Sequence, residues 1–281
     1  MRAMLLGLAV AIAVGCAPKP TACPQDPSTT LGPPFLWRVQ RGDGPVVWLY
    51  GTVHDAGIAA VPASALEALA TSTRFASELG SAEPDPDRLR ERSRLERGPG
   101  IDQQLATDDW WDLRDALRDK IREDDLKRAR PWYALILLNR RAAGEVVAMD
   151  GELANKARGR QLPIEGLETW DEQLAALDAS VTIDDLTQAI HARDSLRCSF
   201  RGMRAIYDAG DLATMGALLV VPRTAERMLY ARNRAWLPKL EAYLASGGAF
   251  VAVGLGHMIG DQGLPALLER AGYRVQRVPT R

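Results

Sequence analysis

The sequence predicts an α/β protein in which two β-α-β halves form a small, mostly parallel sheet, with a large helical insertion between them. A strand, a helix and a second strand follow one another over residues 46–79. The same order recurs over residues 249–278. Between these halves, residues from about 84 to 245 carry mostly helical patterns. Strands that alternate with helices are typical of βαβ units, whose strands lie parallel.

The first half begins with a predicted hairpin. Residues 35–40 alternate between core-facing and outward positions, and the turn-forming residues 41–45 join them to the apolar strand 46–50. A helix over 62–70 starts with a proline, which suits the first helical turn. A short strand over 73–79 completes the unit and is expected to lie parallel to the strand before the helix.

The inserted segment is predicted to be helical except for a third core strand over 161–165. Its tryptophans are interpreted as core residues, because they recur at helical spacing. Residues 131–138 are apolar nearly all round, which predicts a buried helix. The expected helices cover residues 88–97, 108–117, 131–138, 150–158, 183–198 and 202–218, with another starting at Thr169.

The second half starts with a long helix over 223–244, which is expected to end at a glycine pair, Gly247 and Gly248. An apolar strand over 250–254 follows, then a helix from about Gln262 and a strand over 273–278.

Two of the three histidines occupy the same sequence setting. His54 and His257 each lie three residues after a glycine that ends an apolar strand. Ligands of open α/β sheets bind at the carboxyl ends of the strands, and imidazole is a common metal ligand and acid-base group. Glu78 ends the next strand of the first half and is expected at the same edge. The third histidine, His191, is predicted to face solvent on a helix.

The composition argues against nucleic-acid binding. Lys and Arg number 35 against 36 Asp and Glu, and aromatic residues make up 6% of the chain. A nucleic-acid-binding protein ordinarily carries a basic excess or stripe. At 281 residues and 47% hydrophobic content, the chain is long enough for one large domain or two small ones.

The N-terminus is typical of a bacterial lipoprotein. Residues 1–15 combine one arginine with a short apolar stretch that ends in small residues before Cys16, as in a signal peptide with a lipobox. Cys16 is then the lipidated first mature residue; a plain signal peptide cut nearby is the alternative. Ala17 in place of Asp favours sorting to the outer membrane of the cell envelope. Residues 16–34 read as a flexible tether to a domain over 35–281.

Two further cysteines, Cys23 in the tether and Cys198 in a helix, are able to pair in an oxidising compartment. Alternatively, Cys198 is a small buried hydrophobic residue.

These motifs, taken in order, resemble the TraB/GumN family, which includes the TIKI metalloproteases. The resemblance covers residue 35 to the end and rests on two G-x-x-H motifs, an acidic residue after the first, a G-L-E-T-x-x-x-Q segment, an R-N pair and a final G-H-x-x-G-x-x-G. The corresponding residues here are Gly51 to His54, Glu78, Gly166 to Thr169 with Gln173, Arg232 with Asn233, and Gly256 with His257, Gly260 and Gly263.

The resemblance implies a divalent metal held by His54, Glu78 and His257. Two imidazoles and a carboxylate leave positions open for water and substrate. Glu168 is then a fourth ligand or the general base. Arg232 and Asn233 orient substrate or stabilise an oxyanion, or they form a structural pair. Zinc suits these ligands, whereas the TIKI resemblance implies manganese or cobalt.

The resemblance departs from the family pattern at two places. Family members often carry a second acidic residue soon after the glutamate, where this chain has Gly80. The stretch 84–145 matches no family motif and is expected to set substrate choice.

The resemblance further implies a fold similar to the erythromycin esterase and ChaN proteins, and metal-dependent hydrolysis of a peptide or other small substrate. Hydrolysis of an ester, and non-catalytic binding at the cell envelope, are the alternatives. The sequence predicts no oligomeric state.

Overall fold

The computed structural model describes residues 31–143 and 148–280, in which six strands form one sheet in the order β4-β3-β5-β2-β1-β6. The pairs β2–β5, β3–β5 and β3–β4 are parallel, whereas β1 is antiparallel to both β2 and β6. The predicted α/β class with a mostly parallel sheet is therefore confirmed. The strands are β1 (Leu36–Gln40), β2 (Val47–Thr52), β3 (Arg74–Ser77), β4 (Ile164–Gly166), β5 (Ala249–Gly254) and β6 (Arg274–Arg277).

The two β-α-β halves interleave instead of lying side by side. Strands β2 and β3 of the first half are parallel, but β5 of the second half lies between them and pairs with both. Every residue of β5 is buried, as expected of an apolar strand covered on both faces. This position makes β5 the direct parallel neighbour of β2, so the strand before His54 lies next to the strand before His257.

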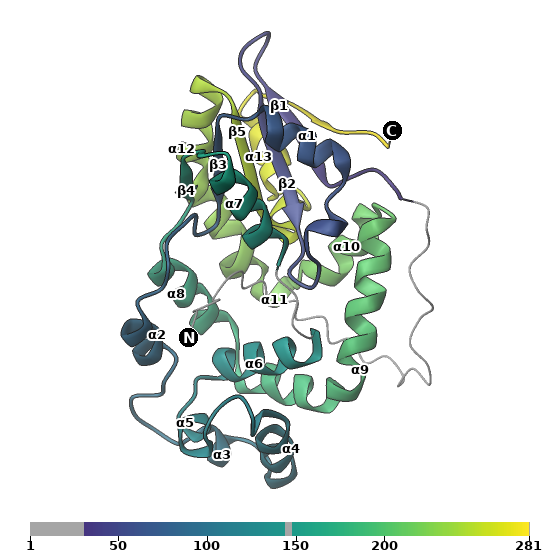
Figure 1. Ribbon diagram of the computed structural model, residues 1–281. Coiled ribbons are helices and arrows are strands. Elements are labelled where there is room, and N and C mark those ends of the chain that lie inside the picture. The colour runs from purple at the N-terminus through teal and green to yellow at the C-terminus, as the bar shows by residue number, and fades with distance from the viewer. Residues whose placement is uncertain (1–30, 144–147, 281) are drawn as a thin grey trace.

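Helices cover both faces of the sheet (Figure 1). The helices α1 (Ala63–Thr71) and α7 (Met149–Gly159) lie on one face, and α12 (Ala231–Ser246) and α13 (Leu264–Arg270) lie on the other. Helix α12 ends where Gly247 adopts a φ of 77°, a left-handed value that favours glycine. The predicted glycine stop of this helix is therefore confirmed.

The inserted helices form a second lobe beyond the carboxyl ends of the parallel strands (Figure 1). Its core is separate from that of the sheet and includes the buried Trp110 and Trp132, as predicted, whereas Trp111 is half exposed. Apart from α7 and α12, which cover the sheet, the helices of the insertion are α2 (Pro86–Arg92), α3 (Ile101–Gln104), α4 (Thr107–Leu117), α5 (Glu123–Lys127), α6 (Pro131–Ala143), α8 (Trp170–Ser180), α9 (Ile183–Asp208), α10 (Leu212–Leu219) and α11 (Pro222–Ala225).

Two expected helix boundaries in the insertion differ from the structure. The break predicted between helices over 183–198 and 202–218 is wrong, because α9 runs unbroken over Ile183–Asp208. This helix packs against both α6 and α10. Gly202 inside it is tolerated, since one glycine costs a helix only about 1 kcal/mol. Further on, α11 passes through a π-helical turn, Glu226–Tyr230, before α12. Such π turns are frequent at functional sites.

His191 lies exposed on α9 and pairs with Asp109, so its predicted solvent-facing position is confirmed. The prediction for Cys16 lies outside the described residues, and so does Cys23, the predicted partner of Cys198, whereas Cys198 itself lies in α9. None of the helices in the described ranges is both long and apolar enough to cross a membrane.

Candidate active site

The register of the sheet brings the predicted site residues to one edge. The ends of β2 and β5 are paired, with Thr52 opposite Gly254. His54 follows β2, His257 lies in a 3-10 turn directly after β5, and Glu78 follows β3. These three side chains line one cavity of about 80 Å³. The structure thus places together the three residues that the sequence proposes as metal ligands.

His257 is held in a single tautomer by Asn233. The Asn233 amide nitrogen donates to the carbonyls of His257 and Gln262, so its oxygen faces the ring and lies 2.6 Å from His257 Nδ1. Nδ1 therefore carries the proton, and Nε2 is left as the acceptor. Burial, followed by the charge of Arg232, lowers the pKa of His257 to about 3, which keeps the ring neutral.

His54 contacts a carboxylate that sequence reasoning did not identify. Its Nδ1 lies 2.9 Å from Asp150 Oδ2, at the start of α7, as an ion pair without an aligned hydrogen bond. Burial acts to lower the pKa of His54, but the carboxylate of Asp150 and, more weakly, those of Glu78 and Asp55 outweigh it, so the pKa is raised. Nothing in the sequence links Asp150 to His54, because almost a hundred residues separate them.

Several buried polar atoms near His54 have no hydrogen-bond partner in the described chain. They belong to residues of the β2 end and to Asp150: Thr52 Oγ1, both ring nitrogens of His54, Asp55 Oδ1 and Asp150 Oδ1. Buried polar atoms are ordinarily paired, so each exception needs an explanation. Thr52, His54 and Asp55 also line the cavity, which is consistent with a site that binds a polar or charged ligand. Asp55 was not predicted either, although it directly follows His54.

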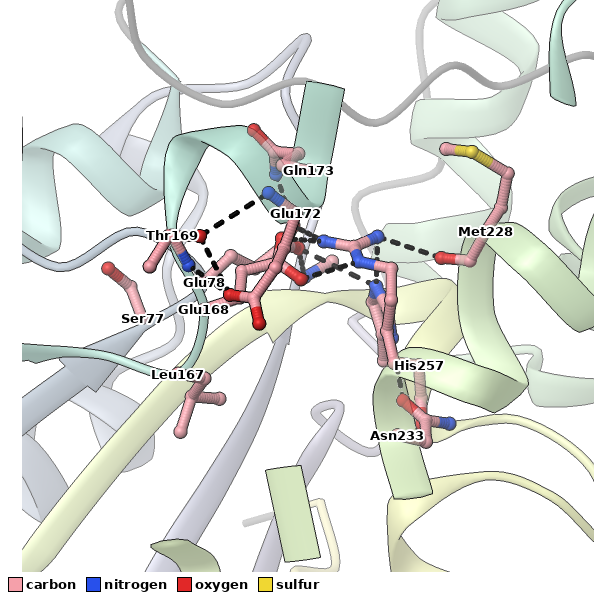
Figure 2. A network of polar contacts seen from close by, with 12 residues as sticks. Ser77, Glu78, Leu167, Glu168, Thr169, Glu172, Gln173, Met228, Asn233 and His257 are labelled. Carbon is pink, nitrogen blue, oxygen red and sulfur yellow. Dashed lines mark hydrogen bonds and ion pairs between the residues drawn. The ribbon is translucent and has the colours of Figure 1, made fainter. Parts of the chain in front are cut away.

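Arg232 is the centre of a polar network that includes Glu78, Glu168 and His257. Figure 2 shows these three partners close together. The Arg232 guanidinium donates to both carboxylate oxygens of Glu168, to Glu78 Oε2 at 2.6 Å and to the Met228 carbonyl at 2.7 Å. It also lies 3.2 Å from His257 Nε2. Burial acts to lower the pKa of Arg232, but the two glutamates raise it above its ordinary value, so the side chain stays charged.

Glu78 is fixed by three donors from separate parts of the chain. Arg232 and Gln173 donate to its Oε2, and the backbone N–H of Gly254 donates to its Oε1 at 3.0 Å. Burial acts to raise the pKa of Glu78, but Arg232 and then the histidines lower it to about 2. The carboxylate is therefore ionised beside His257, whose Nε2 lies 3.8 Å from Glu78 Oε1.

Glu168 contacts Arg232 but does not line the cavity. It is buried, and burial, together with the charge of Glu78, raises its pKa despite the opposing effect of Arg232. This placement makes Glu168 a residue that positions the guanidinium. It offers no support for the roles of metal ligand or general base, which remain predictions.

The motifs quoted from the sequence thus meet in one network. Thr169 caps α8 through a reciprocal capping box with Glu172, and this aims Gln173 of the same helix at Glu78. Gly80 has a φ of 61°, and a Cβ there would lie 2.5 Å from the Glu165 carbonyl carbon. The backbone therefore leaves no room for the acidic side chain that family members often carry nearby.

The donor set fits a divalent cation, but not without movement. Across residues 31–143 and 148–280, no three His, Cys, Asp or Glu side chains stand close enough to enclose a metal ion. The guanidinium of Arg232, which contacts both Glu78 and His257 Nε2, explains this. Each histidine nevertheless has Nδ1 engaged by an oxygen, as metal-ligating histidines usually do, with Nε2 left for a ligand. A cation would need Arg232 to withdraw from His257.

Fold and site together define an α/β protein with a buried histidine-carboxylate-arginine centre at the carboxyl ends of its parallel strands. The model of the TraB/PrgY/gumN family matches residues 35–277, and the chain belongs to that family. No curated protein and no solved structure matches the chain.

Proposed function

We propose that this protein is a metal-dependent hydrolase that cleaves a peptide bond. The metal is manganese, cobalt or zinc, and its ligands are His54, Glu78 and His257. The observation that carries the proposal is the similar placement of the two histidines. Each lines the cavity together with the ionised Glu78, and each has Nδ1 next to an oxygen, of Asp150 or Asn233.

A bound divalent ion of this kind supplies a water of lowered pKa and polarises a carbonyl group. The chain's own residues prepare the site for that chemistry. Asn233 keeps His257 in the tautomer with an unprotonated Nε2. Arg232, which Glu168 holds at the cavity, supplies a positive charge that stabilises negative charge developing on the substrate carbonyl.

The test is metal analysis of the purified tether-free domain, followed by cleavage of a peptide library with and without chelator. His54→Ala, His257→Ala and Glu78→Ala are each expected to abolish metal binding and hydrolysis. His191→Ala is the matched control, because this exposed histidine pairs with Asp109 and does not line the cavity, and it is expected to change neither. Full hydrolysis by a folded His54→Ala, His257→Ala double variant in excess chelator would overturn the proposal.

Glu168 has its own diagnostic outcome. Because Glu168 holds Arg232, Glu168→Gln is expected to keep the metal and to lower turnover. A general base also predicts retained metal, with turnover reduced by roughly a hundredfold to ten-thousandfold. Loss of the metal in this variant would instead identify Glu168 as a ligand.

The alternative is a non-catalytic envelope protein that binds its ligand in the cavity. The specific observation in its favour is that Arg232 already neutralises Glu78 and contacts His257. A purified protein that holds no metal, and that takes up none of the three candidate ions, would favour this alternative. Covalent trapping of a side chain by an acylating inhibitor would favour an esterase instead.

The proposed location is the bacterial cell envelope, with the domain anchored through a lipid on Cys16 and sorted to the outer membrane. The support is the sequence before Cys16 and the Pro-, Ser- and Thr-rich stretch that follows it.

A further inference from the structure

The cavity has two chemically different walls. His54, Glu78, Arg232 and His257 supply the polar wall. The other wall is apolar and comes mainly from the second half of α9, the segment after α10 and the π-helical turn. Its side chains are Phe200, Met203, Leu219, Val221, Met228, Leu229 and Leu255.

Most charges at this cavity are compensated by one another. Asp55 is the exception, because its Oδ1 has no hydrogen-bond partner among the described residues, and burial raises its pKa. Arg232 faces Glu78 and Glu168, and His54 faces Asp150. None of the described residues on the apolar wall is charged, and Thr224, which lies beside it, donates its hydroxyl to the Val221 carbonyl. A charged substrate side chain against this wall would be buried without a partner, which is costly. An apolar side chain would instead bind with a favourable free energy that grows with the apolar surface it removes from water.

Two residues of the apolar wall are suited to set the size of the space. Phe200 and Met203 lie three positions apart on α9, so they project from the same face of the helix. Both are only partly buried, so they still offer apolar surface to a ligand. Methionine is flexible and adapts to ligands of different shape.

We infer that the apolar wall is a specificity subsite for an aliphatic side chain on the substrate residue next to the bond that is cleaved. Phe200 and Met203 set the size of that side chain. This inference rests on the proposed hydrolase function, because it takes the bound peptide to be the substrate. The binding preference itself can be measured without hydrolysis.

The residues that would select the substrate then lie in a different part of the insertion from the one expected. The sequence suggested that residues 84–145 set it, yet of the described residues in that stretch none lines the cavity. The lining residues of the insertion lie between 200 and 232. Residues 84–143 build the separate helical core instead.

The first experiment measures binding to the metal-free protein, using the full chain as it is purified. Capped tripeptides Ala-Leu-Ala, Ala-Ala-Ala and Ala-Asp-Ala are titrated calorimetrically. The leucine peptide is expected to bind about tenfold or more tightly than the alanine peptide, in line with the value of added methylenes in an apolar pocket. Equal affinities for the leucine and aspartate peptides would overturn the inference.

The second experiment uses variants of Met203 to change the size of the side chain that the subsite prefers. Met203→Trp is expected to fill the subsite and shift the preference from leucine towards alanine, and Met203→Ala to shift it towards larger side chains. Trp111→Ala is the control, because Trp111 is an exposed apolar residue outside the cavity lining. An unchanged order of preference in a folded Met203→Trp variant would overturn the assignment.

The same peptides, carried into the cleavage assay, separate the two proposals. Cleavage that favours leucine over alanine and aspartate supports both. Absence of cleavage, with the leucine preference in binding intact, overturns the hydrolase function and keeps the subsite. Cleavage without preference for any of the three side chains keeps the hydrolase and overturns the subsite.

Discussion

Replacing Arg232 by methionine is expected to destabilise the metal-free protein strongly, because one guanidinium compensates two buried carboxylates. Arg232 contacts Glu78 and Glu168, and all three side chains are largely shielded from solvent. Removing one member of a buried ion network leaves an uncompensated charge, which typically costs about 3–5 kcal/mol. Methionine keeps most of the volume of the arginine stem, so the loss reports charge more than packing.

The pKa of Glu78 gives an independent magnitude. Its ordinary value of 4.5 is lowered to about 2 in the folded protein. Burial acts to raise this pKa, and Arg232 makes the largest contribution that lowers it. At 1.36 kcal/mol for each pKa unit, this corresponds to roughly 3 kcal/mol of stability. A carboxylate with a depressed pKa contributes this stability above about pH 4.5 and loses it as the pH falls towards about 2. Arg232→Met should therefore cost most at pH 7 and progressively less in acid.

The assay is thermal unfolding in chelator at pH 7 and at acid pH. For a domain of this size, about 3 kcal/mol corresponds to a decrease in Tm of roughly 6–12 °C. Arg234→Met is the matched control, since Arg234 lies two residues along α12 and pairs with Glu226 at the surface. Exposed pairs of this kind contribute about 0–1 kcal/mol. Arg234→Met should therefore change the Tm little.

The effect of metal ions on the Tm of Arg232→Met is a second test. Without Arg232, a divalent cation meets no competitor at Glu78 and His257, so manganese is expected to raise the Tm of Arg232→Met. An ion at a hundred times its Kd stabilises by about 2.7 kcal/mol. A folded Arg232→Met variant with a wild-type Tm at pH 7 would refute the reasoning, because the carboxylates would then not depend on the guanidinium.

Three further predictions concern His54, His257 and the N-terminus. Asp150→Asn should weaken metal binding by about ten- to a hundredfold by loosening His54, as measured by competition with a chelating dye; unchanged affinity would contradict the orienting role of Asp150. His257 has its pKa lowered from 6.5 to about 3, so the unfolded chain binds the extra proton between those values and stability falls as the pH drops through that window. In chelator, the wild type should lose about 1.4 kcal/mol per pH unit there relative to His257→Gln, and parallel denaturation curves for the two proteins would count against it. Cys16→Ser should release the protein from membranes or block its processing, and identical fractionation and mobility would argue against lipidation.

Local patterns in the sequence were enough to predict most strands, the helices around the sheet and the glycines that end them. Apolar periodicity and turn residues act over a few positions, so β2, β5 and α12 could be placed from their own residues. The setting of His54, Glu78 and His257 at strand ends also follows from the sequence, because it needs only the direction of each strand.

What the tertiary structure alone decided is how distant segments meet. Local periodicity carries no record of which strands become neighbours, so the insertion of β5 between β2 and β3 could not be predicted. The same holds for Asp150 beside His54 and for the apolar wall from α9, since their partners lie far away in the chain. Arg232 and Glu168 were recognised by motif, but their direct contact emerged only when α12 and the segment after β4 were packed together. Long-range packing, through burial and charge compensation, thus fixed the chemistry of a site whose residues the sequence had already supplied.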